Sequence, residues 1–221
     1  MCAIFGSFDP SMWEILYEAN KQRGNFASSL VCLTHDDQFI FKKEGDIDFD
    51  KIKYGKNTEY IVGHVQAPTS SKRIWSYETS HPFESLSWLV FHNGVLTNEK
   101  QIRQHYLPFI ENPVDTALIV NLIQFFTDNN TNTPSPVDAI RQTLELIQGT
   151  YALCIVDSDT NEVYIARSGS ILHYDDKGNY STLPGSNYKE LPEGVIMNLD
   201  KKKRKWKKVG SFKHKSPYIF L

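Results

Sequence analysis

The chain has 221 residues, 40% of them hydrophobic, so it can bury a substantial core, and its net charge of −2 gives it no overall bias toward nucleic acid or membranes. Its three cysteines are scattered without CxxC spacing, which argues against a disulfide framework and a zinc site. No apolar run approaches the roughly 20 residues of a membrane span, and the N-terminus lacks the pattern of a signal peptide. We therefore expect a cytoplasmic protein with no membrane partner.

The apolar spacing predicts strands, then helices, then strands again. Strand-like runs cover residues 2–8, 27–35, 37–43, 59–67 and 87–94, with a helical pattern at 11–22 after the first. Helical patterns follow at 97–107, 115–126 and 135–147, and strand-like runs return at 151–159, 162–170, 171–176 and 194–200. This order is typical of an α+β fold and not of a βαβ alternation. Because we find no internal repeat and no convincing linker, we expect a single domain over residues 2–221.

Cys2 directly follows the initiator methionine. If Met1 is removed, one residue carries both a thiol and a free α-amine, and the thiol becomes a candidate nucleophile. The alternative is structural: Cys2 would only begin a buried strand, because a free cysteine behaves as a small hydrophobic residue.

Two stretches could contribute either to turns or to chemistry. In GHVQAPTSS, residues 63–71, a strand leaves into a loop that carries a cluster of hydroxyl groups. Asn93-Gly94 between two apolar runs is the usual signal of a tight hairpin turn. The same pair could instead direct the Gly94 N–H and the Asn93 side-chain amide at one oxygen, as an oxyanion site requires.

Asp115 stands where the N-cap of a long apolar helix belongs, and capping alone would explain it. A carboxylate there could also bind a substrate ammonium group, and the spacing does not separate the two roles. His81 and His92 would allow a Cys–His arrangement, but none of the seven histidines has metal-ligand spacing. We favour structural or loop roles for the histidines and expect no metal and no cofactor.

The segment 201–208, KKKRKWKK, has seven basic residues in eight, and removing its +7 from the net −2 leaves −9 for the rest of the chain. The default interpretation is the solvated face of a hairpin. A contact patch for nucleic acid or for an acidic partner is the alternative, in which Trp206 could stack on a base.

Taken together and in this order, several of these stretches resemble the class II glutamine amidotransferases, as in glucosamine-6-phosphate synthase and amidophosphoribosyltransferase. The matching features are Cys2 followed by IFG, Arg23-Gly24, GHVQAPT, SHP, HNG, a DT pair before a helix, and GTYAL with the later ARSGS. They extend from Cys2 to about Ser170, roughly three quarters of the chain. The resemblance implies the four-layer αββα sandwich of the N-terminal-nucleophile hydrolases, with two antiparallel sheets between helix layers.

The resemblance also implies a set of residue roles. The Cys2 thiolate would attack the side-chain amide of L-glutamine, with the Cys2 α-amine as the base, to give a glutamyl thioester. Asn93 and Gly94 would hold the oxyanion, and Asp115 would bind the α-ammonium group of the substrate. The other substrate-binding positions that the resemblance marks are Arg23, Thr69 and His81.

Gln66 departs from the family pattern, because it stands where the family has an arginine that grips the glutamine α-carboxylate. A neutral amide cannot make the bidentate, charge-assisted contact of a guanidinium, and the loss could cost on the order of 1.5–3 kcal/mol in binding. Three alternatives stay open: Lys72 or Arg73 substitutes, glutamine binds weakly until a partner docks, or the substrate amide is not free glutamine. A second departure, Ala3 in place of a family glycine, is minor.

The expected function is a free-standing glutaminase subunit that gives glutamate, and ammonia for a separate acceptor synthetase or transferase. Only about 50 residues follow Ser170, and no phosphate-binding loop of the GxxxxGK type occurs. The alternatives are an N-terminal-nucleophile amidase acting on another amide or γ-glutamyl compound, and a catalytically silent regulatory or binding subunit. The segment 201–208 could dock an acidic partner or a nucleic acid.

Overall fold

Two antiparallel sheets form the centre of the fold in the computed structural model, which describes residues 2–49, 52, 57–67, 74–129 and 135–214. The first sheet has the strand order β11-β9-β10-β1-β4-β2-β3, and the second has the order β13-β12-β8-β7-β6-β5. The strands of the first sheet are β1 (Ala3–Ser7), β2 (Ala27–Leu33), β3 (Gln38–Glu44), β4 (Tyr60–Gln66), β9 (His173–Tyr174), β10 (Tyr180–Ser181) and β11 (Lys189–Glu190). Those of the second are β5 (Phe83–Glu84), β6 (Trp88–Leu96), β7 (Gly149–Asp157), β8 (Val163–Ser168), β12 (Val195–Asp200) and β13 (Lys205–Ser211).

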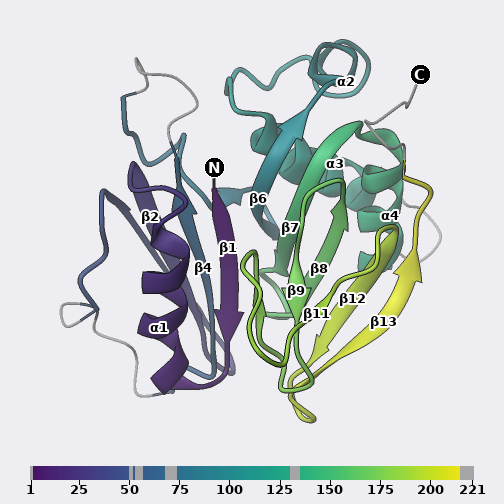
Figure 1. The fold of residues 1–221 in the computed structure, drawn as a ribbon. Coiled ribbons are helices and arrows are strands. Elements are labelled where there is room, and N and C mark those ends of the chain that lie inside the picture. Colours follow the sequence, from purple (N-terminus) through teal and green to yellow (C-terminus); the bar gives the residue numbers. More distant parts are fainter. Residues whose placement is uncertain (1, 50–51, 53–56, 68–73, 130–134, 215–221) are drawn as a thin grey trace, which may run out of the picture.

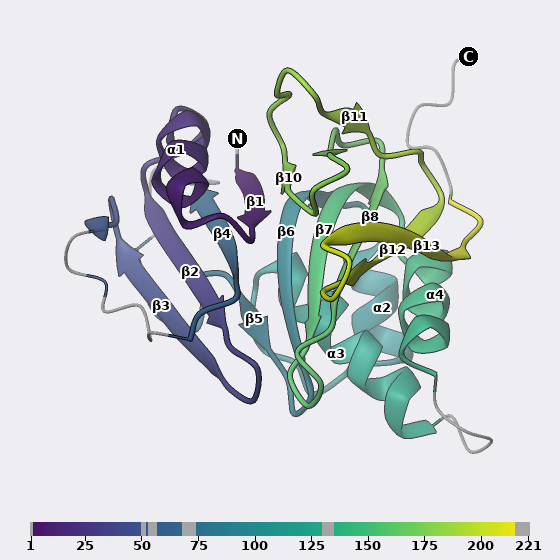
Figure 2. The same cartoon turned by 90° about the horizontal axis from the view of Figure 1, so that it is seen from below.

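Helices cover the outer faces of both sheets (Figures 1 and 2). The helices are α1 (Pro10–Lys21), α2 (Glu99–His105), α3 (Asp115–Asn129) and α4 (Pro136–Leu146). Figure 2 shows α1 on one side of the paired sheets and the other three helices on the opposite side. The expected αββα sandwich is therefore confirmed, and the central strands are covered on both faces, which explains why every residue of β2 and β4 and all but one of β7 are buried.

Three apolar layers hold these elements together. Between the two sheets, Ile4, Val62 and Phe91 belong to one buried cluster, which also contains residues of β7, β8 and β12. Trp13 and Tyr17 pack α1 on the outer face of the first sheet, and α2, α3 and α4 pack on the second through their own buried residues. No helix in the described part of the chain is long and apolar enough to cross a membrane.

The helix α1 follows from local rules of capping and spacing. Asp9 is its N-cap, since an Asp9 oxygen accepts the Ser11 N–H at 2.9 Å, and Pro10 occupies the first turn. Trp13, Leu16 and Tyr17 share one face at helical spacing and are all buried. The helix ends at Lys21, just before Arg23-Gly24, as the sequence predicts.

Of the two interpretations of Asn93-Gly94, the hairpin turn is wrong. Both residues lie inside β6, where Asn93 pairs with Ala152 and Gly94 with Tyr151 of β7. Gly94 has a φ of 156°, and a Cβ there would lie 1.9 Å from the Thr150 oxygen. The glycine is therefore required by the close approach of β7 and not by a turn.

The segment 201–208 forms the turn between β12 and β13 and the first part of β13, so the hairpin interpretation is confirmed. Its cationic side chains are mostly exposed, with Lys201 partly buried. Trp206 is held in the fold: its Nε1 donates to the Asn179 oxygen at 3.1 Å, and its ring meets the Tyr180 ring edge to face. Because the indole already has these partners, the structure gives no support to base stacking by Trp206.

Candidate active site

Cys2 lies directly before β1, in the middle of the first sheet, and is partly buried. β1 pairs with β4 through Ala3 and Val65, so one step further along the same antiparallel register Cys2 stands opposite Gln66. Arg23 reaches the same point from the end of α1, because its Nε donates to the Cys2 carbonyl oxygen at 3.1 Å. The structure thus brings together Cys2, Arg23 and Gln66, which the sequence analysis had marked as site residues.

The loop that carries Arg23 is packed tightly against the end of β4. A Cβ at Gly24 would lie 2.4 Å from the Ala67 nitrogen, so only a glycine allows this approach. Phe26 donates its N–H to the Gln66 oxygen at 2.9 Å and fixes the loop there. Gln66 itself is only 2% exposed. The predicted site residue Thr69 and the substitutes Lys72 and Arg73 lie outside the described residues.

The second sheet contributes Asn93 and Gly94 from β6, which contacts β1 across the interface between the sheets. His64 of β4 joins the two sheets at this level, with its Nε2 3.3 Å from the His92 carbonyl oxygen. Asn93 follows His92 and is 8% exposed. The Gly94 backbone lies over the His92 ring, since a Cβ on Gly94 would approach Nε2 of His92 to 2.8 Å.

Asp115 is the first residue of α3, and its carboxylate extends back to the end of β6. One oxygen accepts the Leu96 N–H at 3.0 Å, and the other lies 3.5 Å from Nδ1 of His92. Burial tends to raise the pKa of Asp115, but the contacts with His92 and with the N–H groups of Leu96 and Thr116 outweigh it and hold the pKa below its ordinary value. The carboxylate is therefore ionised near neutral pH and is held by groups from β6 as well as from its own helix.

A buried cluster of histidines surrounds Thr116 behind this carboxylate. The Thr116 hydroxyl is 3.1 Å from Nε2 of His81 and 3.2 Å from Nδ1 of His92. The His81 ring stacks on the His64 ring, with their centroids 3.9 Å apart. These histidines are packed in the interior, as expected for a structural role. The sequence analysis did not identify Thr116 and His64 as partners of His81 and His92. The only local signals were the position of Thr116 after Asp115 and of His64 within GHVQAPT.

Among the described residues, no group of three or more His, Cys, Asp or Glu side chains could hold a metal ion. The candidate site combines a partly buried thiol, two peptide or amide donors on β6 and an ionised carboxylate. Such a set can attack a carbonyl carbon, hold a negative oxygen and bind a cationic group.

Comparisons with known proteins agree with this geometry. The glutamine–fructose-6-phosphate aminotransferase [isomerizing] of Staphylococcus epidermidis is 28% identical over 182 residues, which cover 78% of this chain and 30% of the relative. The chain is homologous to class II glutamine amidotransferases. It spans about a third of the length of the curated relatives that it matches. No family model matches the chain.

Solved structures share the fold. The glutamine phosphoribosylpyrophosphate amidotransferase of B. subtilis, complexed with ADP and GMP, has a TM-score of 0.75 at 18% identity and covers 95% of this chain and 49% of its own. A predicted glutamine amidotransferase from Pseudomonas aeruginosa has a TM-score of 0.56 at 12% identity and covers 95% of both chains. The resemblance seen in the sequence is thus confirmed at the level of homology and of fold.

Proposed function

We propose that the chain hydrolyses the side-chain amide of L-glutamine through a thioester on Cys2 and releases ammonia for a separate acceptor enzyme. The observation that carries this proposal is the joint placement of the oxyanion donors and the ionised Asp115 on β6 and the start of α3, across the sheet interface from β1. In this reading residues 2–221 form one glutaminase domain. Its three free cysteines fit a reducing cytoplasm.

The proposed reaction needs no group outside this site. With Met1 removed, the Cys2 α-amine takes the thiol proton while the sulfur attacks the amide carbon; an amine with pKa about 8 and a thiol with pKa about 8.5 suit this transfer. Asn93 and Gly94 donate hydrogen bonds to the tetrahedral oxyanion. The protonated amine then gives its proton to the leaving nitrogen, ammonia departs, and water cleaves the thioester to glutamate.

The substrate contacts follow from the same placement. Asp115 would accept the α-ammonium group, and Arg23 lies beside the nucleophile. His81 contacts Thr116 and so supports Asp115 from behind. We place Thr69 near the substrate on the resemblance alone.

Gln66 favours a second candidate, an amidase for another amide or a γ-glutamyl compound. It stands opposite Cys2, is buried, and carries no charge for an α-carboxylate. A glutamyl compound whose α-carboxylate is blocked would lose no binding contact at this position, because it has no free carboxylate for a cation to bind.

The first test is the intact mass of the protein before and after incubation with a diazo-ketone analogue of glutamine. We expect loss of Met1 and a single adduct that is absent in Cys2→Ala, together with equal release of glutamate and ammonia from glutamine. A trimmed chain that forms no adduct and hydrolyses neither glutamine nor γ-glutamyl peptides would refute the enzymatic proposal. Faster hydrolysis of an α-amidated glutamine than of free glutamine would select the second candidate.

A further inference from the structure

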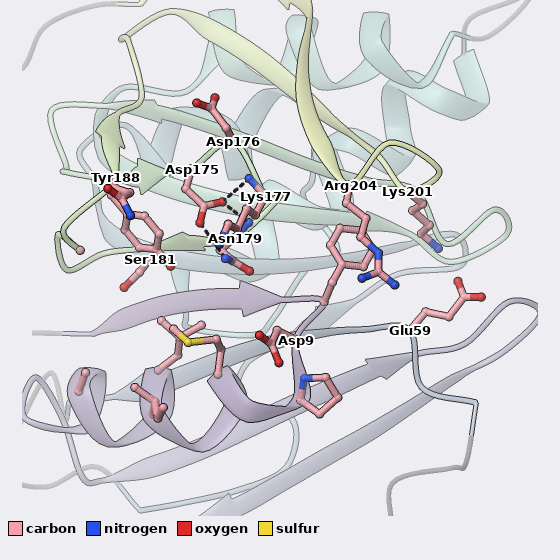
Figure 3. A pocket seen from close by; sticks show the side chains of 18 of the residues that line it. Asp9, Glu59, Asp175, Asp176, Lys177, Asn179, Ser181, Tyr188, Lys201 and Arg204 are labelled. Carbon is pink, nitrogen blue, oxygen red and sulfur yellow. Dashed lines mark hydrogen bonds between the residues drawn. The ribbon is translucent and has the colours of Figure 1, made fainter.

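A large groove of about 2070 Å³ lies beside α1 (Figure 3). Its walls are α1, the segment 175–189 and the β12–β13 turn at 201–204. Small-molecule sites usually have volumes of about 300–1,000 Å³, so a single metabolite would leave most of this groove empty. Its size fits a segment of another macromolecule.

The groove extends along β1 beside α1. Phe8 lines it just beyond the end of β1, and Leu183 lines it near the start of the same strand, because the neighbouring Thr182 donates its N–H to the Ile4 oxygen at 2.9 Å. The basic hairpin lies at the Phe8 end, whereas Cys2 precedes the opposite end of β1.

One wall of the groove is apolar and belongs to α1. Met12, Ile15 and Ala19 recur at helical spacing along the side of the helix that lines the groove, and Ile15 is 58% exposed. Leu183 and Pro184 line the groove as well. An exposed isoleucine between such neighbours provides an anchor point for apolar side chains of a partner.

The other wall is cationic and comes from the basic hairpin. Lys201, Lys202, Lys203 and Arg204 all line the groove, and the last three are exposed. Figure 3 shows Arg204 and Lys201 extending from the hairpin toward the side of the groove that carries Asp9 and Glu59. The Arg204 guanidinium lies over the Phe8 ring, 5.4 Å from its centroid, which holds one cation at the edge of the groove.

We propose that this groove binds an acidic, amphipathic segment of a partner protein. Apolar side chains of the segment would pack on Met12 and Ile15, and its carboxylates would face Lys202 and Arg204. Complementary charges arranged in this way fix the position of the segment in the groove and speed its association with the chain. This proposal gives the segment 201–208 a role that is separate from the chemistry at Cys2.

A nucleic acid fits the same surface less well. Asp9, Glu59 and Asp176 also line the groove, and their carboxylates would repel a uniformly charged phosphate backbone. Trp206 is already engaged by the Asn179 oxygen and the Tyr180 ring, so the hairpin offers no indole for stacking. Scattered carboxylates do not exclude a protein segment, which can place its own apolar or basic residues beside them.

The test uses a labelled synthetic helical peptide with leucine at positions i, i+3, i+4 and i+7 and glutamate at most others. Binding to the full chain is followed by fluorescence anisotropy at two salt concentrations. We expect binding that weakens with salt, and a loss of about tenfold or more in affinity for both Ile15→Asp and the double variant Lys202→Glu/Arg204→Glu. The matched controls are Leu86→Asp, an exposed residue outside the groove, and Lys100→Glu on α2; both should bind as the unchanged chain does.

Three outcomes would overturn the proposal. The first is equal binding by Ile15→Asp and the unchanged chain, since the contact would then be electrostatic only. The second is tighter binding of a single-stranded oligonucleotide than of the peptide, with the same response to Lys202→Glu/Arg204→Glu. The third is no detectable binding at a peptide concentration of about 1 mM. Thermal unfolding of each variant shows that the fold is retained.

Discussion

Thr116→Val tests whether the buried histidine cluster supports the carboxylate of Asp115. Valine keeps the shape of threonine but removes the hydroxyl, which lies 3.1 Å from His81 and 3.2 Å from His92. Thr116 is 1% exposed, so no water replaces the lost partner. A buried polar group that loses its partner costs about 1–3 kcal/mol. Nδ1 of His92 keeps the Asp115 carboxylate at 3.5 Å, so the lost His81 contact predicts a decrease of about 1–3 kcal/mol in the free energy of unfolding.

Thr143→Val is the matched control. Thr143 is also fully buried, but its hydroxyl donates to the Ala139 carbonyl oxygen in its own helix, at 3.0 Å. Removing that bond should cost about 0.5–1.5 kcal/mol, because the carbonyl keeps its place in the helix ladder. The contrast between the two variants isolates the histidine contacts from the general cost of a buried Thr→Val exchange.

The assays are urea unfolding and steady-state hydrolysis of glutamine. If Asp115 binds the α-ammonium group as proposed, Thr116 affects substrate binding through Asp115, so Thr116→Val should raise KM for glutamine more than it lowers kcat. Thr143→Val should leave KM unchanged. Equal stability losses in the two variants, or an unchanged KM in Thr116→Val, would show that the cluster does not position Asp115.

Two further variants probe β6 and its carboxylate. Gly94→Ala would place a Cβ 1.9 Å from the Thr150 oxygen and should cost about 3 kcal/mol or more in urea unfolding, against about 1 kcal/mol for Gly45→Ala, where φ is also positive but the space is open. Asp115→Asn should lower stability near neutral pH. Because the pKa of Asp115 lies below its ordinary value of 3.8, its contribution is present above that value and is lost as the pH falls through the lower folded value. Unfolding curves of the two proteins should therefore converge in strong acid; a constant difference would contradict the cause that we assign to His92.

The elements were predictable because their signals are local. Capping by Asp9, the apolar face of α1 and the apolar run within β7 can each be recognised from neighbouring residues alone. Asn93-Gly94 shows the limit of that information. Asparagine–glycine favours a turn in isolation, but here the reason for the glycine is the Thr150 oxygen, more than fifty residues away in sequence.

The histidine cluster could not be found in the sequence for a related reason. His64, His81 and His92 are spread over three segments, and each is consistent with an ordinary buried position. Only the pairing of the strands and the start of α3 bring His81 and His92 to one hydroxyl group and stack His64 on His81. Polar networks of this kind depend on tertiary geometry, whereas the order of motifs was enough to indicate the family.

The position of Gln66 in the strand register shows which energetic terms a glutamine changes there. The family resemblance marks position 66 as one where an arginine is expected. In the structure Gln66 stands opposite Cys2, is 2% exposed, and has its backbone in the ladder with β2. A guanidinium in that place would be buried at a high cost whenever no carboxylate lay beside it. The amide avoids this cost in the empty site and gives up a charge-assisted contact in the occupied one. Glutamine at this position therefore favours the unliganded fold, and the missing contact should raise KM for a substrate with a free α-carboxylate.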